Sequence, residues 1–480
     1  MSWNNISSLL PPGTYRQRWE EDRLQSMLAQ MPVVVLTGAR QVGKTTLLRH
    51  LEASLRQATS CRYVTLDDLS IAQQARDDPG SLWEGYDLVI IDEVQRDPQL
   101  LRTIKAAVDE ARWQSMAGEA GPGAASGSGR LLDTGPRFTG PGPRFILSGS
   151  ANLLLMHRVA ESLAGRAAYL VLRPFTVGEL AGDEKPSTLL QDLLEGRLPA
   201  SGSGPAPGSG SAPGSATDEL DPFPFITRGL MPGLYGSPDP VEPRLWWDGY
   251  VTTYLERDLR NLADISSLID FRRVMQALAV RAGRLLNQAE VARDTAVPPA
   301  TLSRWLNLLE TGHLGQRLPA FFASRGQRLV KMARLFWADA GLPAFLAGLS
   351  AAETLADSRE GGPLFENLVH HHLSVLAGLL DPPGRLYHWR TQRGAEVDFV
   401  VERGQALVAF EVKSARRVTY NDTEGLRTFL AAYPECRAGV LVYRGREVIT
   451  LGSRVVALPW EFLVRGRAGG RPFPTPARGR

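Results

Sequence analysis

The stretch that decides the fold of the first part of the chain reads VVVLTGARQVGKTTLL and runs from Val33 to Leu48. Its apolar start predicts a short buried strand over Val33–Leu36, and a helix is predicted from Lys44 to about Leu55. Between them, Gly38–Thr45 matches the pattern G-x-x-x-x-G-K-[ST]. In a strand–loop–helix context, the amides of such a loop and the positive end of the helix face phosphate groups.

This pattern is the Walker A motif, and it predicts a nucleotide site. The expected nucleotide-binding residues are Gly38, Ala39, Arg40, Gln41, Val42, Gly43, Lys44, Thr45 and Thr46. Lys44 should reach the β- and γ-phosphates, and Thr45 should bind Mg²⁺. A Walker B pattern follows, in which the apolar run Leu88–Ile91 precedes Asp92 and Glu93. We expect Asp92 to bind Mg²⁺ and Glu93 to polarise the attacking water, which makes ATP and Mg²⁺ the predicted ligands.

Strands and helices alternate on both sides of these motifs. Further strands are predicted over Tyr63–Leu66, Phe145–Leu147 and Tyr169–Leu172. This alternation predicts an α/β fold with a parallel sheet covered by helices, over residues 1–185. Two stretches rich in Gly, Ser, Pro and Ala are expected to be a disordered insertion, 117–143, and a low-complexity linker, 186–225.

Four segments in matching order resemble the bacterial and archaeal AAA+ ATPases that are fused to a C-terminal domain of unknown function. They read GARQVGKTTLL, IIDEVQ, ILSGSAN and ESLAGRAAYLVLRPFTVGEL. The resemblance implies that Ser148 or Ser150, where the fourth strand ends, senses the γ-phosphate. It also implies that Arg166 acts on the phosphates, within one subunit or from a neighbour in a homo-oligomer. A surface or salt-bridge role is the alternative for Arg166.

Residues 226–345 read as mostly helical. Within them, the segment 287–310 has two helices separated by a turn with two prolines, which suggests a helix-turn-helix or winged helix. The second helix starts with polar residues that could touch DNA: Thr301, Ser303 and Arg304. A winged helix that serves only as an interdomain module is the alternative, because this helix carries a single basic residue near its start.

Residues 346–464 contain a pattern of acidic residues and one lysine. Asp398 is followed thirteen residues later by Glu411, and Glu411 and Lys413 alternate on a predicted strand. With Glu366 on a predicted helix, these residues resemble the core of PD-(D/E)xK nucleases, a restriction-endonuclease-like α/β fold. Carboxylates and a lysine could hold Mg²⁺ and activate a water. The alternatives are a folded but inactive domain and a chance pattern. We expect the neighbouring His370, His371 and His372 to lie on the helix surface.

Composition adds only general limits. The net charge of +3 does not by itself argue for nucleic acid, and Arg-rich residues 465–480 are expected to form a basic tail. Two distant cysteines, no signal peptide and no long apolar run predict a cytoplasmic protein without a membrane partner. The leading prediction is an ATPase coupled to DNA processing. A nucleotide-gated switch or scaffold that binds a partner or DNA without cleavage, and a DNA-binding regulator, are the rivals.

Overall fold

The structure of the chain is a computed structural model. It describes residues 15–118, 142–149, 163–201, 220–236, 241–253, 267–322 and 332–465. The chain forms two compact units. The P-loop unit comprises Glu20–Arg173 and Thr311–His313, and the larger unit comprises Met1–Trp19, Pro174–Glu310 and Leu314–Arg480.

A five-stranded parallel sheet is the centre of the P-loop unit, with the order β2-β3-β4-β1-β5. The strands are β1 (Val33–Thr37), β2 (Cys61–Thr65), β3 (Leu88–Asp92), β4 (Arg144–Ser148) and β5 (Ala167–Val171). The strands β1, β3 and β4 are buried along their whole length, as expected for a parallel sheet with both faces covered. The predicted parallel α/β sheet is therefore confirmed, and its strands bring the ends of β1, β3 and β4 to one edge.

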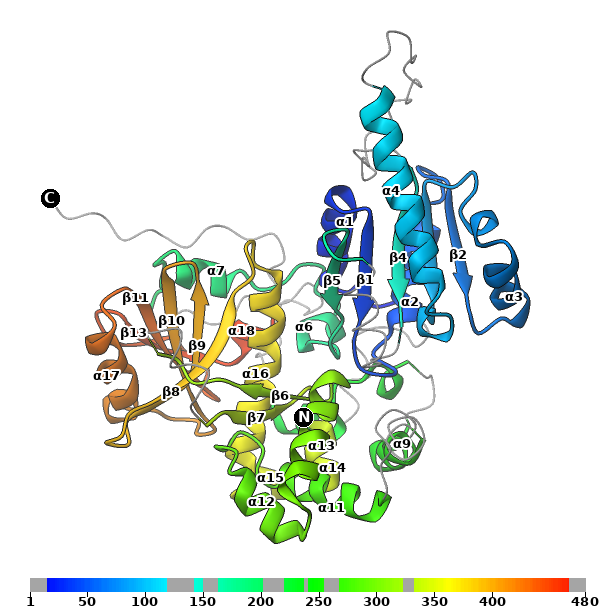
Figure 1. Cartoon of the computed structure of the whole chain (residues 1–480). Coiled ribbons are helices and arrows are strands. Elements are labelled where there is room, and N and C mark those ends of the chain that lie inside the picture. The colour runs from blue at the N-terminus through cyan, green and yellow to red at the C-terminus, as the bar shows by residue number, and fades with distance from the viewer. Residues whose placement is uncertain are drawn as a thin grey trace, which may run out of the picture. The chain divides into compact units, whose positions relative to one another are not determined.

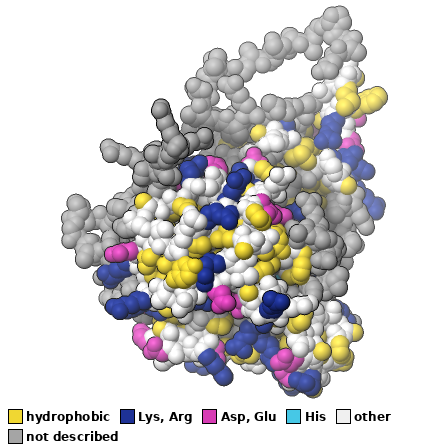
Figure 2. All heavy atoms as spheres, turned by 90° about the vertical axis from the view of Figure 1, so that its left-hand side faces the viewer, with side chains coloured by type: hydrophobic (Ala, Val, Ile, Leu, Met, Phe, Trp, Pro, Cys, Tyr) yellow, Lys and Arg dark blue, Asp and Glu magenta, His cyan; other side chains and the backbone are white. Residues whose placement is uncertain are grey.

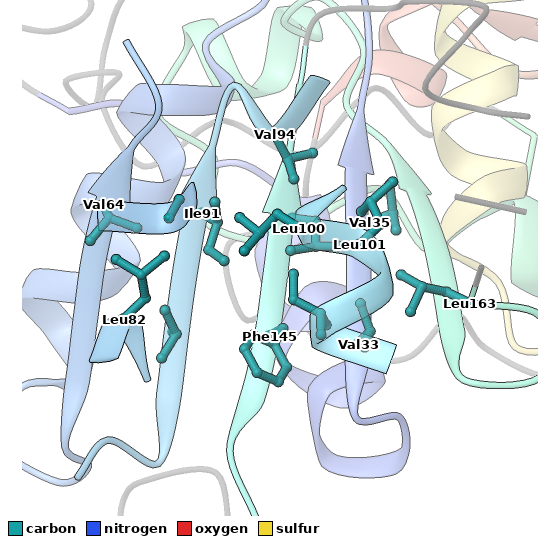
Figure 3. Close-up of a cluster of buried hydrophobic side chains, with 14 of the residues drawn as sticks. Val33, Val35, Val64, Leu82, Ile91, Val94, Leu100, Leu101, Phe145 and Leu163 are labelled. Carbon is teal, nitrogen blue, oxygen red and sulfur yellow. The ribbon is translucent and has the colours of Figure 1, made fainter. Parts of the chain in front are cut away.

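Helices cover the sheet, and in Figure 1 α4 runs across the face turned to the viewer. The helices are α1 (Glu20–Gln30), α2 (Lys44–Leu55), α3 (Leu69–Asp77) and α4 (Leu100–Gly118), with the 3₁₀ helices η2 (Pro79–Leu82) and η3 (Val94–Arg96). Figure 3 shows how Leu100 and Leu101 of α4 pack on Val33, Val35 and Phe145 of the strands. This apolar layer makes the sheet a rigid support for the loops at its edge.

The first part of the larger unit is mainly helical. Its helices are α6 (Val177–Leu180), α7 (Leu189–Leu194), α8 (Phe223–Arg228), η4 (Pro232–Leu234), α9 (Pro243–Tyr250), α11 (Leu268–Ala279), α12 (Gln288–Thr295), α13 (Pro299–Thr311), α14 (Gly341–Leu346) and α15 (Ala352–Ala356). A two-stranded antiparallel sheet, β6 (Gly315–Leu318) and β7 (Arg334–Trp337), follows α13. In α13, Leu302 and Trp305 are buried and Arg304 is exposed. The winged helix stays a prediction.

The second part of the larger unit contains a mixed six-stranded sheet with the order β12-β13-β11-β10-β9-β8. Its strands are β8 (Arg385–Arg390), β9 (Glu396–Arg403), β10 (Ala406–Lys413), β11 (Cys436–Tyr443), β12 (Ile449–Gly452) and β13 (Val455–Pro459). The accompanying helices are α16 (Gly361–Leu379), η7 (Tyr420–Thr423), α17 (Glu424–Ala432) and α18 (Glu461–Val464). This α/β arrangement is present, but the restriction-endonuclease-like fold stays a prediction.

One expectation for this part is wrong. His370, His371 and His372 do not lie on a helix surface, because each is at most 3% exposed. His371 Nε2 lies 3.0 Å from the carbonyl oxygen of Phe175, and the backbone amide of Val177 donates to His372 Nε2 at 3.0 Å. Helix α16 is buried around its whole circumference at this level, so three consecutive histidines face protein.

Several other expectations fall at the limits of the described residues. Of the predicted insertion 117–143, residues 119–141 lie outside the described residues, as do 466–480 of the predicted tail. The predicted linker 186–225 includes α7, in which four leucines are buried, and the start of α8. Both cysteines are free. In the described ranges, no helix combines the length and apolar character that a membrane crossing requires. The predicted domain limits and the cytoplasmic location stay predictions.

Candidate functional site

The P-loop wraps from the end of β1 to the start of α2. Three of its residues have positive φ angles, namely Gly38 at 148°, Gln41 at 60° and Gly43 at 95°. A Cβ atom at Gly38 would lie 2.3 Å from the carbonyl oxygen of Leu172, so only glycine fits there. Left-handed residues turn successive amides to one side of a loop and make an anion-binding concavity. Helix α2 begins at Lys44 directly after Gly43, so its positive N-terminal end adjoins the loop, as the strand–loop–helix pattern predicts.

Lys44 lies inside this loop. Its side chain is 7% exposed, and Nζ donates to the carbonyl oxygens of Gly38 at 3.0 Å and Ala39 at 2.9 Å. Burial lowers the pKa of Lys44 to about 8, against the opposing effect of the Glu93 and Asp92 carboxylates. Within the part of the chain that the structure describes, this buried ammonium group is held by backbone carbonyls, which leaves it well suited to bind an incoming polyanion.

Asp92 ends β3 directly beside the loop, and its carboxylate accepts hydrogen bonds from three residues. Thr45 Oγ1 donates to Oδ2 at 2.7 Å, the Tyr63 hydroxyl donates to Oδ2 at 2.8 Å, and the Glu93 amide donates to Oδ1 at 3.1 Å. A threonine hydroxyl and a carboxylate side by side are hard oxygen ligands of the kind that Mg²⁺ prefers. The residues present therefore fit a magnesium site formed by Thr45 and Asp92.

Glu93 follows Asp92 in an unusual backbone conformation. Its φ of 56° is left-handed, which a side-chain-bearing residue rarely adopts and which is concentrated at functional sites. Burial and the neighbouring Asp92 carboxylate raise the pKa of Glu93, and its Oε2 accepts a hydrogen bond from Gln95 Nε2. A carboxylate with a raised pKa is a suitable general base.

The other two residues predicted for catalysis are in different situations. Ser148 ends β4, is 0% exposed, and among the described residues its Oγ has no hydrogen-bond partner. An unpaired buried hydroxyl at the sheet edge is compatible with a ligand-sensing role. Arg166 instead forms a two-pronged ion pair with Asp109 of α4, at 2.5 and 2.9 Å. This contact favours the salt-bridge alternative for Arg166. Ser150 lies outside the described residues.

Two residues of this unit were not expected from the sequence. Tyr63 on β2 binds Asp92, and the Arg49 guanidinium of α2 lies 3.8 Å from the centre of the Tyr63 ring. His313 also belongs to the P-loop unit, and its Nε2 lies 3.1 Å from Oγ1 of Thr37. Burial, and then the positive charges of Arg173 and Lys44, lower the pKa of His313 to about 4. The only local signal for Tyr63 was its place in a predicted strand, and nothing local marked His313.

The second predicted site lies in the larger unit. Asp398 on β9 and Glu411 on β10 are 5% and 8% exposed, and Lys413 Nζ donates to Glu411 Oε1 at 2.8 Å. Burial and the charge of Asp398 raise the pKa of Glu366 on α16. The charge of Glu411 raises this pKa further, and the charge of Lys413 opposes the rise. The predicted residues therefore do come together in one place.

An unpredicted arginine joins this cluster. Arg334 Nη1 lies 2.8 Å from Asp398 Oδ1 and 3.6 Å from Glu366 Oε2, and Nη2 lies 3.2 Å from Glu396 Oε2. Over the described residues, no group of three or more His, Cys, Asp or Glu side chains is arranged to hold a metal ion. The residues present thus do not fit the Mg²⁺ that a PD-(D/E)xK nuclease would need.

Basic side chains give little sign of a DNA-binding face in the view of Figure 2. The part of the surface turned to the viewer there intersperses Lys and Arg with Asp, Glu and apolar side chains. Proteins that bind nucleic acid commonly gather basic side chains into a patch or stripe. DNA as a partner stays a prediction.

Comparisons with known proteins match three separate stretches of the chain to family models. Residues 30–121 match the model of the AAA domain, and residues 223–353 and 361–463 match two domains of unknown function, DUF8612 and DUF4143. The chain is 30% identical over 438 residues to the uncharacterized protein Rv2008c of Mycobacterium tuberculosis, an alignment that covers 91% of this chain and 82% of the relative. The uncharacterized protein Mb2031c of Mycobacterium bovis gives the same values.

One solved structure that matches the chain is the Walker-type ATPase PABY2304 of Pyrococcus abyssi, with a TM-score of 0.37 and 16% identity, covering 71% of this chain and 99% of that one. The AAA domain match confirms the prediction of a P-loop ATPase domain. Because the model matched at residues 361–463 has no known function, the nuclease-like core stays a prediction.

Proposed function

We propose that the P-loop unit of this chain, which belongs to the same family as the uncharacterized mycobacterial proteins Rv2008c and Mb2031c, binds ATP with Mg²⁺ and hydrolyses the nucleotide. One observation carries the proposal. The Thr45 hydroxyl and the Asp92 carboxylate, which come from the two separate motifs, meet at 2.7 Å beside the buried ammonium group of Lys44. A chance match to either motif would not bring these three groups together.

The side chains suggest a division of roles. The loop amides and Lys44 would bind the phosphates, and Thr45 and Asp92 would hold Mg²⁺. When bound, that ion neutralises charge on the phosphate oxygens. Glu93 would orient and deprotonate the attacking water, and the free hydroxyl of Ser148 would register the γ-phosphate. Arg166 is better explained by its pairing with Asp109 than by contact with phosphate in the same chain.

For the function that is coupled to ATP binding and hydrolysis, we favour a nucleotide-gated switch or scaffold over a DNA-cleaving enzyme. The observation that supports this choice is the ion pairing of Arg334 with Asp398 and its neighbours at the second site. A cation already bound to the carboxylates opposes the metal chemistry of a nuclease. DNA binding and assembly into a homo-oligomer stay predictions.

Two substitutions test the ATPase in the full-length protein. Lys44→Ala should abolish binding of a fluorescent ATP analogue, because it removes the only side-chain cation that the loop encloses in the described structure. Glu93→Gln should retain binding but lower phosphate release by roughly 100-fold or more, within the range expected for general-base catalysis. Lys105→Ala and Glu110→Gln, both on α4, are matched controls of the same residue types and should change neither quantity.

Two results would contradict the proposal. Wild-type protein that binds no nucleotide in the presence of Mg²⁺ would remove the ATPase altogether. A Glu93→Gln variant that turns over ATP at the wild-type rate would show that another group acts as the base.

A further inference from the structure

The carboxylate cluster of the larger unit contains its own cation. The Arg334 guanidinium comes from β7 and contacts carboxylates from two other elements, Asp398 and Glu396 of β9 and Glu366 of α16. Arg334 itself is 7% exposed. A buried guanidinium with fixed carboxylate partners is a specific, oriented contact, because its donors form a rigid planar fork.

Three of the four carboxylate oxygens of Asp398 and Glu411 already accept hydrogen bonds. Asp398 Oδ1 accepts from Arg334 at 2.8 Å, and Asp398 Oδ2 accepts from the Val412 amide at 2.9 Å. Glu411 Oε1 accepts from Lys413. Over the described residues, Glu411 Oε2 is the one buried oxygen of this cluster without a hydrogen-bond partner. Mg²⁺ in proteins binds through one or two carboxylates and keeps several waters, so the ion would need Asp398 Oδ1, which Arg334 already contacts.

Charge leads to the same conclusion. Arginine cannot lose its proton in a protein, so the positive charge at this position is permanent. A divalent ion would have to lie next to the guanidinium, where like charges repel, or displace it from Asp398. Without Arg334, the buried Asp398 carboxylate would lose its ion-pair partner, which is a strongly unfavourable arrangement.

We propose that Arg334 is the resident cation of the Glu366–Asp398–Glu411 cluster and takes the place that a divalent metal ion occupies in a metal-dependent nuclease. The cluster then joins β7 to the six-stranded sheet through charge pairing and holds no metal. This inference is independent of the ATPase, since all of its residues lie in the larger unit.

Manganese binding tests this directly, because Mn²⁺ accepts the same carboxylate ligands as Mg²⁺ and its free form is measured by electron paramagnetic resonance. The full-length protein is treated with chelator and kept free of nucleotide. The wild type and Asp398→Asn should give superimposable Mn²⁺ titrations, because neither holds the ion at this cluster. Arg334→Ser should bind about one additional Mn²⁺ per chain, and the double variant Arg334→Ser/Asp398→Asn should lose it.

Arg317→Ser is the matched control. Arg317 lies on β6, opposite Leu335 in the same two-stranded sheet, and pairs with Glu310, so its loss should add no Mn²⁺ site. Stoichiometric Mn²⁺ binding by the wild type that Asp398→Asn removes would overturn the proposal. A folded Arg334→Ser variant without the additional site would also overturn it. If Arg334→Ser does not fold, Arg334→Lys retains a cation, and the comparison of wild type with Asp398→Asn still decides.

Discussion

Replacing Tyr63 by phenylalanine would test how the proposed magnesium site is held together. The substitution removes one hydroxyl, whose hydrogen bond to Asp92 Oδ2 measures 2.8 Å. The ring would stay, with the Arg49 guanidinium 3.8 Å from its centre, so packing should change little. Burial and the Asp92 carboxylate raise the pKa of Tyr63, so its hydroxyl keeps its proton and donates at every physiological pH.

The size of the effect follows from the partner's charge. A hydrogen bond to a charged group contributes about 1.5–3 kcal/mol. At about 1.4 kcal/mol per factor of ten, this corresponds to roughly a 10- to 100-fold change. Loss of a group that orients a metal-binding side chain costs a similar factor in metal affinity. We therefore expect Tyr63→Phe to raise the Mg²⁺ concentration for half-maximal ATP turnover about 10- to 100-fold, while ATP analogue binding without Mg²⁺ stays unchanged.

The matched control is Tyr86→Phe. Tyr86 packs against the core of the same unit and has the Arg62 guanidinium 5.5 Å from its ring centre, so the control removes a tyrosine hydroxyl from a similar setting. Phosphate release is measured over a range of Mg²⁺ concentrations for both variants. If the two variants show the same Mg²⁺ dependence, Tyr63 does not orient Asp92 for metal binding, and the reasoning is refuted.

Two further predictions concern backbone fit and pH. Gly38→Ala should abolish ATP analogue binding, because its Cβ would lie 2.3 Å from the Leu172 carbonyl oxygen. The control Gly85→Ala, with open space around the Cβ, should retain binding. Equal binding by the two variants would contradict this prediction. Burial lowers the pKa of His372 from 6.5 to about 4. Between these pH values the unfolded chain therefore binds more protons than the folded chain. The stability present above pH 6.5 is lost as the pH falls toward 4. The loss in the free energy of unfolding should approach about 3 kcal/mol. His372→Gln, whose amide oxygen can still accept from Val177, should show a correspondingly weaker pH dependence in urea unfolding; an unchanged dependence would refute this assignment.

The sequence by itself determined the elements whose signal is local. The strand Val33–Leu36 and the helix from Lys44 to Leu55 were predicted within one residue of their observed bounds. Asp92 and Glu93 were placed at a strand end, where Asp92 ends β3 and Glu93 follows it. These predictions succeeded because an apolar run, a glycine-rich turn and a helix start are each encoded by neighbouring residues.

The tertiary structure alone decided which distant residues share a site. Tyr63 reaches Asp92 because β2 lies beside β3 in parallel register, and strand order cannot be read from apolar periodicity. Arg334 meets Asp398 although 64 residues separate them, and no local pattern in the sequence pointed to this contact. His372 is buried because other elements cover every side of its helix. Periodicity reports how one segment prefers to fold, whereas burial and ion pairing depend on which segments pack against it.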